Sequence, residues 1–198
     1  HMDTHSLERA RGITIFASQA QLQLGDWKAA LLDTPGHVDF SAEMERTLWV
    51  LDYAILVING ADGVQAHVRT LWKLLKQYRI PVFLFVNKMD QPGTDRAALL
   101  TELKDTLDGR CVDFTADRAE ADIWEDAAVC DETLLEEFLE QGTLCTESVA
   151  HKIKERQLYP CYFGSALKDE GVQEFLDAMA LYMEPHTYPA EFGARVYK

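Results

Sequence analysis

The chain has 198 residues, of which 47% are hydrophobic and 26% are charged, and its formal net charge is −14. This composition is typical of a soluble globular protein with one sizeable core. No apolar run approaches the roughly 20 residues that span a bilayer, and the amino terminus lacks the basic and apolar regions of a signal peptide. These features exclude membrane-spanning and secreted classes, so we expect a cytoplasmic protein. The four cysteines form no CxxC pair, which favours reduced thiols over a zinc site or a disulfide framework.

The negative charge is concentrated in one segment of the chain. Between Asp113 and Glu147 there are twelve acidic residues and a single basic one, Arg118. A field of this sign repels phosphate, so we expect no binding of free DNA or other nucleic acid through the general field of the chain. The segment either attracts a basic protein or serves as a solvated face that keeps the domain soluble.

The hydrophobic pattern predicts strands that alternate with helices. The predicted elements are a hairpin of strands at 13–24 and 27–33, a helix at 40–51, a strand at 53–58, a helix at 64–75, a strand at 82–86, a helix at 94–107, a strand at 159–163 and a helix at 172–183. Near-continuous apolar strands separated by amphipathic helices indicate an α/β fold. Its sheet is expected to be mostly parallel, with helices on both faces and one antiparallel hairpin at an edge. Ligands of such sheets bind in the loops at the carboxyl ends of the strands.

The tetrapeptide Asn87-Lys88-Met89-Asp90 follows one of the buried strands. A carboxylate there can accept two hydrogen bonds side by side, and guanine presents two adjacent donors, its ring N–H and its exocyclic amine. Bidentate pairs of this kind contribute roughly 1–3 kcal/mol of base discrimination. Asp90 suits this role, while Asn87 can bridge loops or meet the base edge and the stem of Lys88 can cover a ring face. Taken alone, the tetrapeptide is also explained as an ordinary Asn/Asp turn after a strand.

Two other strand ends carry polar or small residues. Asp33 suits water-mediated coordination of magnesium, Gly36 lets a backbone N–H approach a terminal phosphate, and an imidazole at His37 can orient an attacking water. The alternative is that Asp33 caps a helix and His37 is a first-turn residue. After the strand at 159–163, small residues at 164–166 let backbone N–H groups approach an acceptor such as the guanine carbonyl, although Gly-Ser is also a common turn.

Four stretches occur in one order along the chain: ERARGITI (8–15), DTPGHVDF (33–40), NKMD (87–90) and GSALK (164–168). In this order and at these separations they resemble the guanine-nucleotide domain of translational GTPases, in particular elongation factor G and the tetracycline-resistance ribosomal protection proteins. The similarity extends from about Leu7 to Met183. It implies a P-loop NTPase-like G domain that binds and hydrolyses GTP with Mg²⁺ in the intact protein.

The resemblance also implies roles for individual residues. Thr14 is expected to bind magnesium through its hydroxyl and the terminal phosphate through its backbone N–H, Asp33 to lie on the metal side, and Gly36 to sense the phosphate. His37 is the expected catalytic residue, which positions the hydrolytic water. Guanine recognition is expected from Asn87, Lys88 and Asp90, with Ser165, Ala166 and Leu167 closing over the base.

The same resemblance predicts the organisation of the chain and its partners. Residues 1–108 and 159–184 are expected to form the GTP-binding domain, 109–158 an acidic insertion subdomain, and 185–198 a linker and the start of a β-barrel domain. The expected partner is the ribosome, at the GTPase centre and the basic stalk protein of its large subunit, with no membrane partner. Two alternatives to ribosomal protection are an elongation factor G-like translocation factor and a nucleotide-independent ribosome-interaction module.

One motif of the family, the phosphate-binding loop GxxxxGK[ST], is not found in the sequence. Its backbone N–H groups, lysine and hydroxyl cradle the phosphates and magnesium. We therefore expect the 198-residue chain by itself to bind GTP poorly and to hydrolyse it negligibly, whereas the intact protein does both. A nucleotide titration of this polypeptide tests the expectation, and micromolar affinity for GTP would show it to be wrong.

Overall fold

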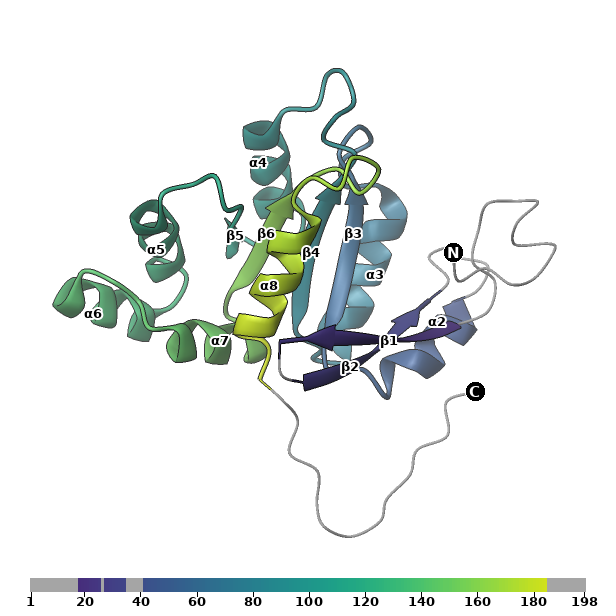
Figure 1. Ribbon diagram of the computed structural model, residues 1–198, viewed down its shortest axis with the longest axis horizontal. Coiled ribbons are helices and arrows are strands. Elements are labelled where there is room, and N and C mark those ends of the chain that lie inside the picture. Colours follow the sequence, from purple (N-terminus) through teal and green to yellow (C-terminus); the bar gives the residue numbers. More distant parts are fainter. Residues whose placement is uncertain (1–17, 26, 35–40, 185–198) are drawn as a thin grey trace, which may run out of the picture. The chain divides into compact units, whose positions relative to one another are not determined.

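The structure is a computed structural model that describes residues 18–25, 27–34 and 41–184. By their contacts the described residues fall into two compact units, which divide between Asp52 and Tyr53 (Figure 1). Within the described residues, no helix is both long enough and apolar enough to cross a membrane.

The first unit contains a hairpin and one helix. Strands β1 (Ser18–Leu24) and β2 (Trp27–Asp33) pair antiparallel, with Ser18 opposite Asp33 and Leu24 opposite Trp27. Gly25 follows β1 with φ +55°, a left-handed conformation that glycine adopts without steric cost. Helix α2 (Ser41–Leu48) comes next. The predicted hairpin is confirmed, and among the described residues it forms a two-stranded sheet of its own.

The second unit contains a four-stranded parallel sheet in the order β3-β4-β6-β5. Its strands are β3 (Ala54–Asn59), β4 (Val82–Asn87), β5 (Cys111–Asp113) and β6 (Tyr159–Phe163). All of β6, and β4 up to its last residue, is buried, because both strands have a neighbour on each side and helices on each face. The sequence does not predict β5, since three residues are too few to show a period.

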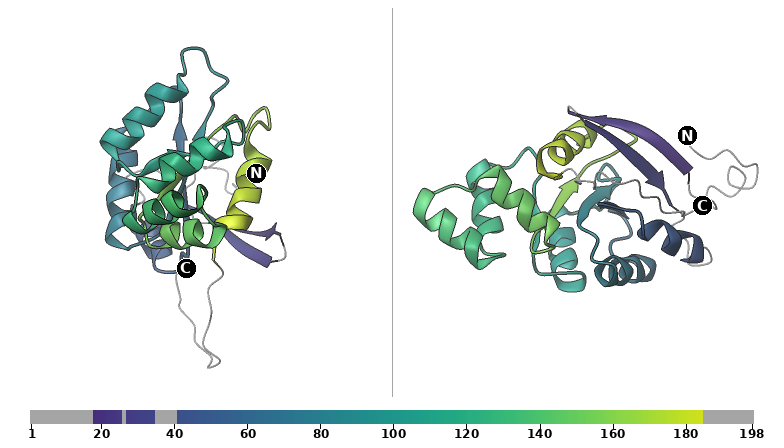
Figure 2. Two further views of the ribbon diagram at one scale, coloured as in Figure 1. Left: turned by 90° about the vertical axis from the view of Figure 1, so that its left-hand side faces the viewer. Right: turned by 90° about the horizontal axis from the view of Figure 1, so that it is seen from below.

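Helices cover both faces of this sheet, as the sequence predicts. Helices α3 (Ala66–Gln77) and α4 (Arg96–Thr106) lie on one face, and α8 (Val172–Tyr182) lies on the other (Figures 1 and 2). On the α3 side the rings of Trp72 and Tyr159 meet at a centroid distance of 4.8 Å.

Aromatic contacts fix α8 on the opposite face. The ring of Phe175 lies 5.1 Å from the rings of both Phe85 and Tyr162, and 6.4 Å from the ring of Phe83. Offset and edge-to-face ring pairs at such distances stabilise a core beyond the area that they bury. The beginning of α8 is thereby held close to the carboxyl ends of β4 and β6.

Three helices lie between β5 and β6, within the segment predicted to be an acidic insertion. They are α5 (Glu120–Ala128), α6 (Glu132–Gln141) and α7 (Thr146–Lys154), the green helices of Figure 1. Their polar faces carry most of the acidic residues of the segment, whereas Ile123, Leu134 and Val149 are buried. The segment is therefore a small helical layer in which each helix has a buried apolar side.

Asp131 joins two of these helices. Its carboxylate accepts hydrogen bonds from the Thr133 and Leu134 N–H groups at the start of α6, at 2.9 and 3.4 Å, and lies 3.0 Å from Lys152 Nζ of α7. Burial opposes ionisation, but the bonds from Thr133 and Lys152 outweigh it and lower the pKa of Asp131 to about 2. Because this value lies below that of an unfolded aspartate, about 3.9, the stabilisation is present above pH 4 and is lost as the pH falls toward 2.

Asp131→Ala should lower the free energy of unfolding by about 1 kcal/mol near pH 7, because the helix cap is lost. Urea unfolding at several pH values measures the effect, and the difference from the native chain should shrink as the pH falls from about 4 to 2. Asp122→Ala is the matched control, since Asp122 is an exposed acid in the first turn of α5. A difference that does not change with pH would contradict the assignment.

Candidate functional site

Asn87 ends β4, and its side chain joins two loops that lie far apart in sequence. Its Oδ1 accepts hydrogen bonds from the N–H of Lys88 at 2.8 Å and from the N–H of Ala166 at 2.9 Å. Lys88 has φ +64°, in the left-handed region that a residue with a side chain rarely adopts. Such backbone strain concentrates at functional sites, where surrounding contacts hold it.

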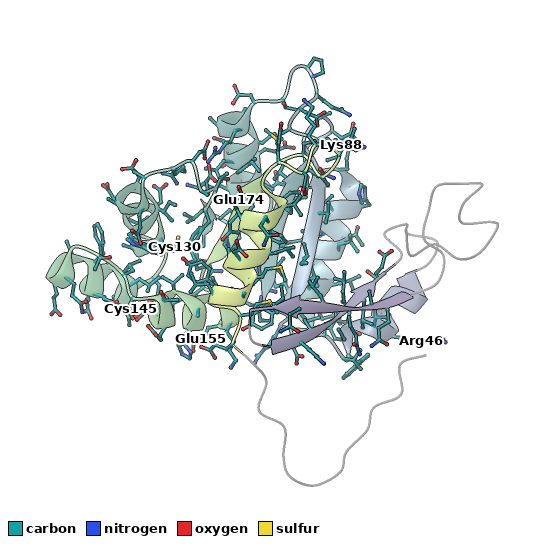
Figure 3. All side chains as sticks on the ribbon, in the orientation of Figure 1. Arg46, Lys88, Cys130, Cys145, Glu155 and Glu174 are labelled. Atoms are coloured by element: carbon teal, nitrogen blue, oxygen red, sulfur yellow. The ribbon has the colours of Figure 1, made fainter. Side chains whose placement is uncertain are left out.

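Backbone hydrogen bonds connect the same loops. The N–H of Met89 donates to the carbonyl of Gly164 at 3.0 Å, and the N–H of Gly164 donates to that of Val86, also at 3.0 Å. On the other side, the N–H of Gly60 after β3 donates to the Asn87 carbonyl at 2.8 Å. The loops after β3, β4 and β6 therefore form one edge of the sheet, where the side chain of Lys88 lies beside the loop from β6 to α8 (Figure 3).

The close packing of the loops at this edge of the sheet requires a glycine at position 164. A Cβ at this position would collide with the carbonyl oxygen of Glu170 and would lie 3.1 Å from the ring of Phe85. The loop from 165 to 170 folds back on itself, since Ser165 and Glu170 exchange N–H to carbonyl bonds at 2.9 and 3.0 Å. The small residue at 164 thus lets this loop pack directly on the end of β4.

Asp90 has a partly exposed carboxylate, with 17% of its side chain accessible to solvent. The nearby hydroxyl of Ser165 lowers the pKa of Asp90, although the two groups do not meet the geometry of a full hydrogen bond. Burial opposes this shift, and Lys168 Nζ, 3.9 Å from Asp90 Oδ2, adds to it. Asp90 is therefore ionised at neutral pH and can accept two adjacent donors.

The predicted base-binding residues meet at this edge. Ser165 is fully buried, whereas Leu167 has 91% of its surface exposed and lies at the outside of the loop. Ala166 and Lys88 are also exposed. These residues thus combine one buried side chain, Ser165, with three exposed ones.

The predicted phosphate-side residues are only partly described. Asp33 is the last residue of β2, is partly buried and belongs to the first unit. Thr14, Gly36 and His37 lie outside the described residues. Within 18–25, 27–34 and 41–184, no three His, Cys, Asp or Glu side chains gather as a metal site. A carboxylate oxygen at Asp33 nevertheless suits the preference of Mg²⁺ for oxygen ligands.

Sequence analysis missed a buried carboxylate that connects the insertion with this edge. Asp113 is 4% exposed and lies 2.5 Å from Arg96 Nε at the start of α4. It also accepts bonds from the N–H and hydroxyl of Thr115, whose Oγ1 in turn accepts from the Phe163 N–H at 3.3 Å. In the sequence, Arg96 could pair with any of many downstream acids, and nothing selects Asp113 among them. The network therefore could not be predicted.

Glu137 of the insertion also has a structural role. Its Oε1 accepts a hydrogen bond from the N–H of Cys145 at 2.7 Å, just before α7. The neighbouring Glu136 is exposed. All four cysteines are free thiols, as the sequence predicts, and Cys145 is the exposed one.

The fold and this edge define an α/β nucleotide-binding domain of the P-loop NTPase type, as predicted. A solved structure of a protein from Thermus thermophilus has the same fold, with a TM-score of 0.78 at 21% identity over 92% of this chain and 34% of that one. A family model described as the elongation factor Tu GTP binding domain matches residues 1–185. The chain belongs to this family of translational GTPase domains, which confirms the predicted resemblance.

Curated relatives share the same region. The tetracycline resistance protein TetW of Butyrivibrio fibrisolvens is 34% identical over 197 residues, which cover 92% of this chain and 31% of that protein. The tetracycline resistance protein TetM from transposon Tn916 of Enterococcus faecalis is 32% identical over 216 residues, which cover 99% of this chain and 33% of that protein. The chain thus spans about a third of the length of these relatives.

Asn87→Ala should loosen the loop after β6, because two backbone N–H groups lose their acceptor. Amide hydrogen exchange at Ala166 should accelerate by at least about tenfold, the equivalent of one hydrogen bond of about 1.4 kcal/mol. Asn59→Ala is the matched control, since Asn59 is the register partner of Asn87 in β3 and, among the described residues, its side chain bonds to the nearby Ala61 and Asp62 alone. Equal acceleration in both variants would show that Asn87 has no special role in joining the loops.

Proposed function

We propose that this chain is the guanine-nucleotide-binding part of a ribosome-dependent GTPase of translation, and that the whole protein is of the tetracycline-resistance ribosomal protection type. Membership of the elongation factor Tu GTP binding domain family supports the binding of GTP. The relatives that cover nearly all of the chain are named tetracycline resistance proteins, which supports the protection type over a translocation factor.

The observation that carries the proposal is the hydrogen bond from the Ala166 N–H to Asn87 Oδ1. It joins the NKMD and GSALK loops, which supports a single ligand position next to the Asp90 carboxylate and the 165–167 backbone. In this proposal Asp90 accepts the ring N–H and the exocyclic amine of guanine. The N–H of Leu167, which has no acceptor among the described residues, approaches the guanine carbonyl, and the stem of Lys88 covers a ring face.

At the phosphate end, we assign Thr14 and Asp33 to the binding of Mg²⁺. When bound, the metal neutralises charge that develops on the phosphates. Gly36 lets its backbone N–H approach the terminal phosphate, and His37 orients the attacking water. Loss of these contacts after hydrolysis would release the segments around Thr14 and after Asp33 from an ordered state and so release the factor from the ribosome.

The acidic insertion, residues 109–158, is proposed to dock the basic stalk protein of the large ribosomal subunit. Residues 1–108 and 159–184 form the GTP-binding domain in this proposal, followed by a linker and the start of a barrel at 185–198. The exposed acids Glu132, Glu136 and Glu140 recur at every fourth position of α6 and form one side of that helix. Glu137 is excluded from the docking face, because its carboxylate holds the start of α7.

Asp90→Asn in the full-length protein should convert guanine preference into xanthine preference, because the ring carbonyl of xanthine replaces the exocyclic donor of guanine. Ribosome-stimulated hydrolysis of GTP and XTP measures the change. The kcat/KM for GTP should fall by about tenfold or more, in line with roughly 1–3 kcal/mol for a bidentate pair, and that for XTP should rise.

Asp169→Asn is the control for that experiment. Asp169 lies exposed in the neighbouring loop from β6 to α8 at φ +58°, a conformation that asparagine tolerates, so the variant should keep its preference for GTP. Retained guanine preference in the Asp90 variant would remove Asp90 from the base site. Tetracycline susceptibility of cells that carry the full-length protein provides a second measurement, and unchanged susceptibility would exclude the protection type.

A further inference from the structure

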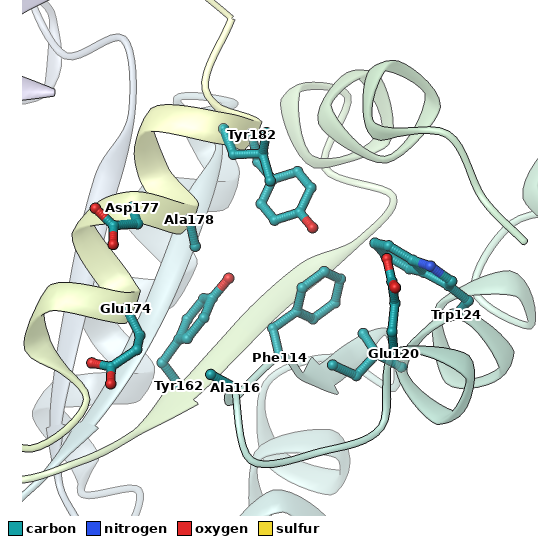
Figure 4. Close-up of a pocket in the computed structure, with 11 residues that line it drawn as sticks. Phe114, Ala116, Glu120, Trp124, Tyr162, Glu174, Asp177, Ala178 and Tyr182 are labelled. Atoms are coloured by element: carbon teal, nitrogen blue, oxygen red, sulfur yellow. The ribbon is translucent and has the colours of Figure 1, made fainter. Parts of the chain in front are cut away.

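A cavity of about 250 Å³ lies between α8 and the beginning of the insertion. Four aromatic side chains line it: Phe114 after β5, Trp124 of α5, Tyr162 of β6 and Tyr182 of α8 (Figure 4). None of the residues at the candidate nucleotide site takes part in it. Its volume is below the roughly 300–1,000 Å³ of pockets for drug-sized ligands, so it suits a small molecule.

Two phenol hydroxyls point into this cavity without a protein partner. Tyr162 is 4% exposed and Tyr182 is 8% exposed. Among the described residues neither hydroxyl has a hydrogen-bond partner. Figure 4 shows both hydroxyls directed toward the space around Phe114. Neither oxygen is fully enclosed by protein atoms, so both hydroxyls are free to bond to a polar group that enters the cavity.

The charges around the cavity have one sign. Its lining includes the carboxylates of Glu120 from α5 and of Glu174 and Asp177 from α8, and no basic side chain. Neither Glu120 nor Glu174 forms an ion pair within the described part of the chain. Burial, together with the charge of Glu120, raises the pKa of Tyr182 to about 12, so this phenol keeps its proton and its oxygen remains a neutral acceptor.

We propose that this cavity binds a small protonated primary alkylamine. An ammonium group carries three N–H donors, and the lining offers the Tyr182 and Tyr162 hydroxyls and the Glu120 carboxylate as acceptors. The alkyl chain would contact Phe114 and Trp124, whose rings also attract cations. An anion would be repelled by the carboxylates, a neutral apolar ligand would leave both hydroxyls unpaired, and a quaternary ammonium has no N–H to donate.

Such a ligand would connect two parts of the second unit. It would touch α5 of the insertion and α8 on the face of the sheet at the same time. Because it binds only where these elements are folded together, it would stabilise the folded arrangement of the insertion by mass action. The site is independent of the proposed GTPase activity and is tested without nucleotide.

The test is a titration of the 198-residue chain with n-pentylammonium chloride, followed through the NMR signal of the Trp124 indole N–H. We expect a saturable shift. Neutral 1-pentanol and bare ammonium chloride should each bind at least about tenfold more weakly, since each lacks either the charged hydrogen bonds or the apolar contacts. Equal binding of 1-pentanol would overturn the proposal, as would a shift that does not saturate.

Variants distinguish binding of the ammonium ligand in this cavity from nonspecific attraction of a cation to an acidic protein. Glu120→Gln and Tyr182→Phe should each raise the dissociation constant by about tenfold, because one hydrogen bond to a charged group is lost. Tyr162→Phe provides a second nearly isosteric variant. Glu125→Gln is the matched control, since Glu125 is exposed on the same helix and does not line the cavity. Equal weakening in Glu125→Gln would overturn the proposal.

Discussion

The amide oxygen of Asn87 accepts two backbone N–H groups at once, and the candidate site depends on this interaction. One donor belongs to the residue that follows in the chain, and the other belongs to Ala166, 79 residues away. Parallel strands bring the ends of β4 and β6 to the same edge, but strands alone leave their loops free to diverge. The side chain of Asn87 removes that freedom. The loops after β4 and β6 are thus held together by the protein itself, without a ligand.

The sequence predicts the layers of this fold well, because apolar runs and helical periods report burial directly. The strand at Val82–Asn87 is an example, since its unbroken apolar run at 82–86, preceded by Pro81, favours a strand covered on both faces. Very short strands, and buried charges that are paired within the fold, leave no such signal in the sequence. Strand β5 has three residues, and the buried acid Asp113 looks in the sequence like any other member of an acidic segment.

The residues of the candidate site can be predicted from the sequence pattern, but the contacts between them cannot. Polar residues directly after buried strands indicate which loops carry chemistry, so Asn87, Asp90 and Ser165 can be selected from the sequence. Their mutual contacts cannot, because a partner far along the chain is chosen by topology. Lys168 shows this limit. It lies in a recognised motif, yet only the structure shows that its ammonium approaches the Asp90 carboxylate.

Asp113 has a mechanical consequence for the insertion. Its carboxylate holds Arg96 at the start of α4 and Thr115 at the start of the insertion, and Thr115 in turn receives the N–H of Phe163, one residue before Gly164. Arg96 also lies over the ring of Phe163, with its guanidinium carbon 5.4 Å from the ring centroid. A displacement of the helical layer would therefore be transmitted to the last residue of β6. A rearrangement at the end of that strand would in turn displace the helical layer.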